Sequence, residues 1–245
     1  MQYLEIDREH SAESARYALL RRLAPALRHQ MAGGFQPVTM MAAIIEKRLQ
    51  AAAPDLPALA KTSKDVRQLA MAATRTSLDL IGWIAPDPEA RVPLCKGVHE
   101  GLHLITTELS FRGFKCVDET GSMTAQVALG PMRGVFVAAL LAITDAVAKP
   151  ATVRVTAQAQ GADVVVTILL TEIDTTAAES GGSSGTGGST GLGLATAPDD
   201  DFLLSVMTYR KIAWADVESI APFDGVTLLQ HTPNHIELRL AADAG

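Results

Sequence analysis

The sequence has only two cysteines, Cys95 and Cys116, and their spacing is not that of a metal site. We therefore expect reduced thiols in a cytoplasmic protein. Net positive charge is lacking as well: the formal charge is −6, which argues against nonspecific binding to nucleic acid or to an anionic membrane. No uninterrupted apolar run approaches the roughly 20 residues of a membrane span. The N-terminus, MQYLEIDREH, lacks the basic-then-apolar layout of a signal peptide, so we expect no membrane attachment.

The first part of the 245-residue chain has the periodicity of long helices. Apolar or small side chains recur at alternating intervals of four and three residues, which is the a/d seam of a helix in a bundle. We predict a helix over residues 11–53, bent near His29 because Pro25 and the Gly33–Gly34 pair weaken it. The seam comprises Leu20, Ala24, Leu27, Met31, Gly34, Val38, Met41 and Ile45.

A second seam over residues 61–85 predicts another helix, after a turn that contains prolines. Two seamed helices joined by a short turn make an antiparallel hairpin with too little core of its own. Pairing with a second copy would bury both seams in a four-helix bundle. The sequence therefore predicts a homodimer.

The rhythm changes after Pro86-Asp87-Pro88, so we expect one domain over residues 1–86 and another over residues 87–245. Helical and alternating segments interleave in the second domain, which predicts an α/β sandwich. A tract of Gly, Ser and Thr interrupts it at residues 180–190. The expected helices cover residues 92–112, 130–148 and about 201–221, and the expected strands cover 114–117, 151–158, 163–171, 226–230 and 235–240.

His29 lies two positions from Leu27 and two from Met31, which places its ring almost opposite the seam of the first helix. Gly33, one turn further on, leaves the approach to the ring sterically open. One interpretation is a solvated surface histidine, since exposed polar positions need no functional explanation. The other interpretation is a nucleophile presented to a partner.

The segment Arg28-His29-Gln30, followed by Gly33 and Pro37, resembles the H-box of bacterial two-component histidine kinases. In that family the histidine accepts phosphate on the first helix of a dimerising hairpin, and the order of elements over residues 91–242 resembles the family's ATP-binding domain. The resemblance implies an α + α/β fold, with a dimeric four-helix bundle followed by a Bergerat α/β sandwich. It also implies that His29 is the phosphoacceptor. Gln30 replaces the family's usual acidic residue, and a glutamine can orient the ring but cannot act as a general base.

The resemblance also implies three nucleotide-binding boxes, of which this sequence keeps one. Asp145 stands at the position of a Mg²⁺-coordinating asparagine, and its oxygens still suit a hard cation. Glu172 stands near the adenine-binding aspartate, but the glycines that should follow it are missing. Gly191 and Gly193 match the end of the glycine-rich lid. We therefore expect a vestigial ATP–Mg²⁺ site and no tightly bound cofactor.

The segment from His99 to His103 matches the zincin pattern H-E-x-x-H, with Glu100 as a possible general base. The alternative is that both histidines flank the apolar stripe of a core helix, and no third ligand follows at the expected spacing. His231 and His235 flank a turn and are interpreted as surface polar residues. We accordingly assign no metal ligands.

These patterns favour a phosphorelay protein, either a histidine phosphotransferase or a pseudo-histidine kinase. In this interpretation His29 exchanges phosphate with the aspartates of response-regulator receiver domains, and Gln30 orients the imidazole. The alternatives are an ATP-dependent histidine autokinase that uses Asp145 and Glu172, a dimeric scaffold in which His29 is incidental, and a zinc metalloprotease at His99-Glu100-x-x-His103.

Overall fold

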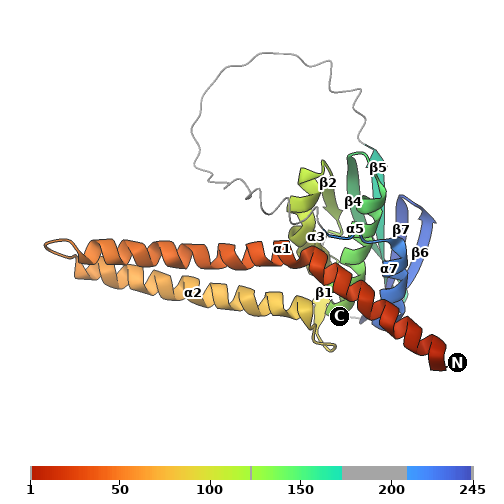
Figure 1. Cartoon of the computed structure of the whole chain (residues 1–245), viewed down its shortest axis with the longest axis horizontal. Helices are drawn as coiled ribbons and strands as arrows, with labels where there is room; N and C mark the ends of the chain where they lie inside the picture. Colours follow the sequence, from red (N-terminus) through yellow and green to blue (C-terminus); the bar gives the residue numbers. More distant parts are fainter. Residues whose placement is uncertain (1, 122, 173–208, 244–245) are drawn as a thin grey trace, which may run out of the picture.

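The computed structural model describes residues 2–121, 123–172 and 209–243. Two long helices, α1 (Gln2–Leu49) and α2 (Leu56–Ile84), form an antiparallel hairpin that projects from an α/β part (Figure 1). The helix α2 begins where Asp55 caps it, because the carboxylate accepts a hydrogen bond from the backbone N–H of Ala58 at 3.0 Å. Near the same end of the hairpin, Arg48 of α1 donates to the hydroxyl of Thr62 of α2 at 2.9 Å.

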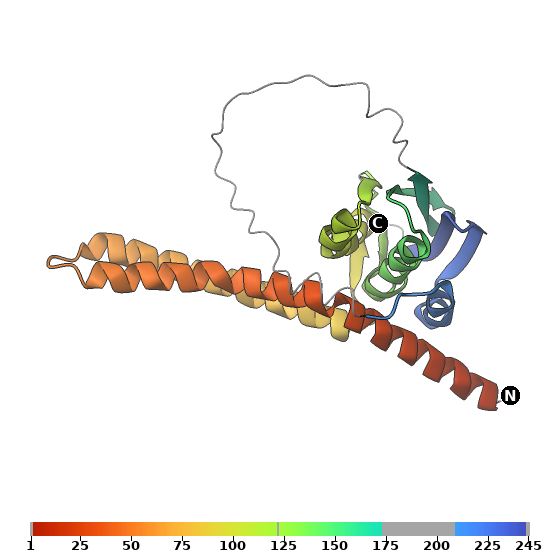
Figure 2. The same ribbon diagram turned by 45° about the horizontal axis from the view of Figure 1, so that its top comes forward.

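The helix α1 has two halves with different surroundings. Its first half lies along the α/β part, and its second half pairs with α2 (Figures 1 and 2). The helix changes direction where it leaves the α/β part, and it contains Pro25, which has no N–H to donate to the preceding turn. The buried residues of the first half are Ala12, Ala15, Leu19, Arg22 and Leu23.

These buried positions correct the expected seam. Ala24 was expected in it but is exposed, because a different stripe of α1, with Leu19 and Leu23, faces the α/β part. From Gly34 onward the seam faces α2, and the backbone of Gly34 lies against Ala73. Leu19 and Leu23 belong to the same hydrophobic core as the α/β elements, so this core extends across the boundary expected after Pro86, and that boundary stays a prediction.

The α/β part is built on a mixed sheet. Its strands run in the order β1-β3-β7-β5-β4-β2, with β6 paired to β7, and only the β2–β4 pairing is parallel among the described residues. Long strands such as β4 alternate buried and half-buried positions, so one face of the sheet is buried. The strands are β1 (Arg91–Pro93), β2 (Lys115–Glu119), β3 (Gln126–Ala128), β4 (Ala151–Gln160), β5 (Asp163–Glu172), β6 (Thr227–Thr232) and β7 (His235–Asp243).

Helices cover that buried face and separate it from α1 (Figure 2). The stretch Leu129–Ala146 is long and apolar enough to cross a membrane, but 72% of it is buried, as expected for the central helix of this layer. The helical elements are α3 (Leu94–Phe111), α4 (Leu129–Pro131), η1 (Met132–Phe136), α5 (Val137–Ala146), α7 (Trp214–Ile220) and η3 (Ala221–Asp224).

The expected fold class, a helical hairpin followed by an α/β domain, is confirmed. Two strands, β1 and β3, were not predicted, because three residues are too few to show an alternating pattern. The first helix begins at Gln2 rather than at residue 11. Residues 180–190 and the start of the helical region expected near residue 201 lie outside the described residues. Within the described residues, the helix α7 begins at Trp214.

Candidate functional site

His29 and Gln30 lie on α1 just beyond its contact with the α/β part. His29 is exposed, and Gln30 is half-buried. Gln30 lines a cavity of about 530 Å³ between α1, the end of α2 and α3. Asp79, Glu100, His103 and Arg133 supply the polar groups of this cavity. The structure thus places the predicted phosphoacceptor on the surface, beside a polar hollow that its neighbour Gln30 helps to form.

Arg133 contacts two other residues that line this cavity, Glu100 and Trp83. Its Nε and Nη2 atoms donate to Oε1 of Glu100 at 2.9 and 2.6 Å. Its guanidinium also lies over the Trp83 ring, 5.3 Å from the centroid, and occupies the space that a side chain at Gly82 would need. These contacts join α2, α3 and η1 in the lining of the cavity that Gln30 also lines.

The Arg133 ion pair bears on the zincin alternative. Glu100 would have to be the general base, but its carboxylate is bonded to a guanidinium. His99 and His103 are exposed, with parallel rings whose centroids are 6.2 Å apart. Among the described residues, no third His, Cys, Asp or Glu converges with this pair as a ligand set would. The geometry therefore gives the metalloprotease interpretation no support.

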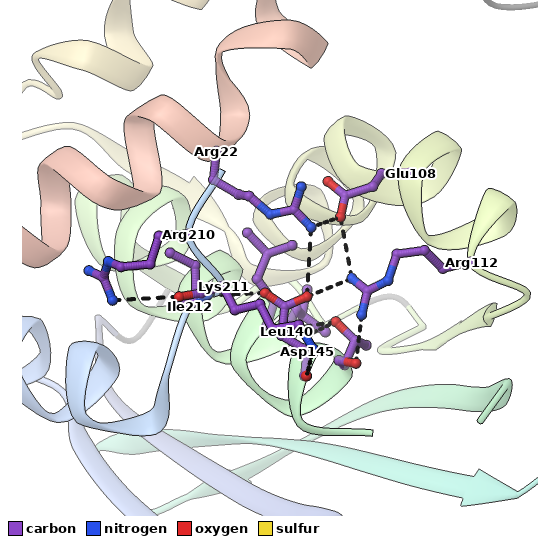
Figure 3. Close-up of polar contacts among 10 residues, drawn as sticks. Arg22, Glu108, Arg112, Leu140, Asp145, Arg210, Lys211 and Ile212 are labelled. Carbon is purple, nitrogen blue, oxygen red and sulfur yellow. Dashed lines mark hydrogen bonds and ion pairs between the residues drawn. The ribbon is translucent and has the colours of Figure 1, made fainter. Parts of the chain in front are cut away.

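Asp145, the expected Mg²⁺ ligand, lies in a buried cluster of charges (Figure 3). Its Oδ1 accepts a bond from Arg112 Nη1 at 2.7 Å and lies 3.6 Å from Arg22 Nη2. Its Oδ2 accepts a bond from the backbone N–H of Ile212 at 3.0 Å. Both carboxylate oxygens are therefore engaged within the protein, which gives Asp145 a structural role, while its role in cation binding stays a prediction.

The same cluster connects four segments of the chain. Arg22 of α1 donates to Glu108 of α3, and Arg112, directly after α3, donates to both Glu108 and the carbonyl of Thr144 (Figure 3). Burial raises the pKa of Glu108 in spite of the two arginines, whose attraction acts in the opposite direction. The cluster therefore fixes the first half of α1 against α3 and α5.

Of the other predicted nucleotide residues, only Glu172 is among the described residues. Glu172 is exposed at the last position of β5, where it pairs with Ala151. No hydrogen bond or ion pair between described residues links Glu172 to Asp145. Gly191 and Gly193 lie outside the described residues.

Sequence reasoning missed the partners of Asp145. The only signal was a charged residue, Arg22, among apolar neighbours such as Leu19, Leu20 and Leu23. Such a residue in a buried stripe indicates a buried partner, because an isolated buried charge is strongly unfavourable. The sequence does not say which carboxylate the partner is.

No protein-family model matches the sequence, and no curated protein matches it either. Among solved structures, the Acinetobacter baumannii histidine kinase AdeS is 12% identical with a TM-score of 0.38, over 85% of this chain and 98% of its own. A complex of the histidine kinase ThkA with the response regulator protein TrrA gives 9% identity and a TM-score of 0.39, over 100% of this chain and 67% of the matched chain. A bacterial phosphotransferase gives 11% identity and a TM-score of 0.35, over 91% and 95% of the two chains.

By their names, these structures are histidine kinases and a phosphotransferase. The identities and TM-scores are low. The function of this chain therefore has to be inferred from its own residues.

Proposed function

We propose that this protein is a dimeric cytoplasmic phosphorelay component that carries a phosphoryl group on His29. The supporting observation is the exposure of His29 on a hairpin helix, within a segment that resembles an H-box. Its partners in this proposal are receiver domains of response regulators. The engagement of both Asp145 oxygens favours phosphate exchange with such partners over phosphorylation from ATP.

In the proposed reaction, a neutral imidazole nitrogen of His29 attacks the phosphorus of a receiver's aspartyl phosphate. The N–P bond forms as the bond from phosphorus to the carboxylate oxygen breaks, and the aspartate leaves as a free carboxylate. The receiver supplies Mg²⁺ and most of the charge that the transferring phosphoryl group needs. Attack by a second receiver's aspartate then regenerates the histidine. Gln30 would act by orienting the ring, because an amide is no base at neutral pH.

The proposal includes a homodimer formed by the hairpin. Large apolar side chains remain exposed along both hairpin helices of the single chain, which is where a second copy would bury them. On the second half of α1 they are Met31, Phe35, Met40 and Leu49, and on α2 they are Leu56, Met71, Leu78, Ile81 and Ile84.

The dimer is tested by sedimentation of two matched variants. Leu78 and Tyr17 are each 63% exposed, but Leu78 lies on the hairpin and Tyr17 lies on the first half of α1. Leu78→Glu should shift the protein toward monomer, and Tyr17→Glu should leave it dimeric. A wild-type protein that sediments as a monomer would refute this part of the proposal.

Phosphate exchange is tested with a receiver domain that has been labelled by a small phosphodonor. We expect the label to reach the wild-type protein without ATP and to be absent from His29→Gln. His10→Gln is the matched control, because His10 is also exposed on α1. If His29→Gln accepts the label as wild type does, His29 is not the acceptor.

The autokinase alternative is tested in the same assay. Asp145 adjoins a cavity of about 310 Å³, which is also lined by Lys211, Trp214 and Gln230. With labelled ATP and Mg²⁺ in place of the receiver, we expect no label on His29. Label that appears there and is lost in Asp145→Ala would establish the autokinase instead.

A further inference from the structure

The hairpin formed by β6 and β7 carries a group of side chains that the phosphorelay does not use. We propose that His231, His235 and Glu237 bind a divalent transition-metal ion of the Zn²⁺ type. One ligand atom from each residue lies within 4.8 Å of the other two, and no other group of three such residues converges in the described parts of the chain. The two histidines were interpreted from sequence as surface polar residues, and Glu237 was not considered.

Strand geometry explains why these residues meet. His235 and Glu237 are two positions apart on β7, so they point to the same face of the sheet, opposite to the buried Ile236. On β6 the pairing register shifts between Gln230 and Thr232, so His231 is the extra residue of a β-bulge. Bulges redirect side chains, and this one places His231 beside both ligands of the neighbouring strand.

The distances suit a metal after small side-chain rotations. Nε2 of His231 lies 3.2 Å from Oε1 of Glu237, and Nε2 of His235 lies 3.9 Å from the same oxygen. The two rings are 4.7 Å apart between centroids. Tetrahedral Zn²⁺ with bonds of about 2.1 Å separates its donor atoms by about 3.4 Å. The β ladder fixes the backbone of His235 and Glu237 on β7, and His231 lies between the paired residues Gln230 and Thr232 of β6.

The donor set selects the class of ion. Two imidazoles and one carboxylate suit Zn²⁺, Ni²⁺ or Cu²⁺, whereas Mg²⁺ and Ca²⁺ prefer oxygen ligands. A surface ion pair with Glu237 would need only one histidine, and here the Nε2 atoms of both rings lie within 4 Å of the same oxygen. The three side chains are 45%, 36% and 27% exposed, in the order His231, His235 and Glu237, so an ion can enter from solvent. Water or an external donor would complete the coordination.

A bound ion would cross-link β6 to β7 at the bulge, where the ladder of backbone hydrogen bonds is interrupted. Its effect should therefore be measurable as stability as well as affinity. This consequence concerns the edge of the sheet, and it does not depend on the proposed role of His29.

The test is calorimetric titration of the full-length, chelator-treated protein with ZnCl₂. We expect one Zn²⁺ per chain for wild type. Affinity should fall about tenfold or more in His231→Gln and in Glu237→Gln, since loss even of groups that only support metal ligands has effects of that size. His103→Gln is the control, because its histidine belongs to the exposed pair on α3, and it should bind as wild type does.

Thermal unfolding with and without Zn²⁺ provides a second measurement. Zn²⁺ should raise the Tm of wild type and of His103→Gln, EDTA should reverse the rise, and His231→Gln should show none. His231 is exposed in a bulge, so this variant should keep its fold, which circular dichroism checks. The proposal is overturned if wild type binds no Zn²⁺, if binding persists unchanged in both His231→Gln and Glu237→Gln, or if it is lost in His103→Gln.

Discussion

The two halves of α1 belong to one helix but are stabilised in different ways. The first half places Leu19 and Leu23 in the main core and Arg22 in the buried charge cluster. The second half pairs with α2 and leaves side chains such as Met31 and Phe35 exposed. The first half of α1 is therefore stabilised by the hydrophobic core of the α/β part. The second half keeps large apolar side chains exposed in a single chain.

Of the substitutions that test this difference between the two halves of α1, Arg22→Ala should have the largest effect on stability. The side chain is 5% exposed and pairs with Glu108 and Asp145, so its removal leaves buried carboxylates short of a partner. We expect a loss of about 3–5 kcal/mol in the free energy of unfolding, measured by chemical denaturation. Arg28→Ala, at an exposed position of the same helix, should change it by less than about 0.5 kcal/mol. Equal losses in the two variants would show that the cluster has no special role.

Leu23→Ala should have the next largest effect. Leu23 is 1% exposed, and the truncation should cost about 3 kcal/mol through lost burial and a residual cavity. Met31 is 39% exposed, so Met31→Ala should cost less than about 1 kcal/mol at protein concentrations where the chain is monomeric. If Met31→Ala proves as destabilising as Leu23→Ala under those conditions, the two halves do not differ as described.

At the far end of the hairpin, Asp55→Ala should have a moderate effect. The substitution removes the bond from the Asp55 carboxylate to the N–H of Ala58, and loss of such a cap costs about 1 kcal/mol. If the substitution increases the rate of hydrogen exchange more in the first turn of α2 than in α3, relative to wild type, the loss of stability lies in the hairpin. Asp65→Ala, within the same helix, serves as the control.

The smallest effect is a pH dependence from Glu108. Burial raises the pKa of this carboxyl in the folded state above its usual 4.5, so the folded protein binds the proton more tightly than the unfolded chain does. Its contribution to stability is therefore fully present below pH 4.5 and is lost as the pH rises through the raised pKa. The unfolding free energy of wild type should fall relative to that of Glu108→Gln over this window. A difference that rises with pH would contradict the assignment.

The elements that the sequence predicted are those with local signals. The helical seams and the alternation in β4, β5 and β7 are visible in windows of ten residues or so, because they follow from the geometry of a single helix or strand. The short strands β1 and β3 exist only through pairing with distant segments, so no local pattern marks them. The start of the first helix was also misplaced, since α1 begins at Gln2 and its residues 5–10 are exposed, so no buried apolar stripe marks this part of the helix.

The residues of the candidate sites also divide into those with a local sequence signal and those that meet only in the folded chain. The exposure of His29 follows from its position relative to the seam, which a helical wheel shows. The buried charge cluster could not be foreseen, because Arg22 and Glu108 are 86 residues apart and meet only in the folded chain. The spacing of His235 and Glu237 was visible in the sequence, but the bulge that brings His231 to them was not.

The continuity of α1 has a mechanical consequence. With a rise of about 1.5 Å per residue, His29 lies about 10 Å along the helix from Arg22, whereas the turn after Leu49 lies about 40 Å from it. If the helix pivots at Arg22 by ten degrees, His29 is displaced by only about 2 Å and the hairpin tip by about 7 Å. Under such a pivot, His29 would stay almost stationary with respect to the α/β part, and the tip of the hairpin would move the most.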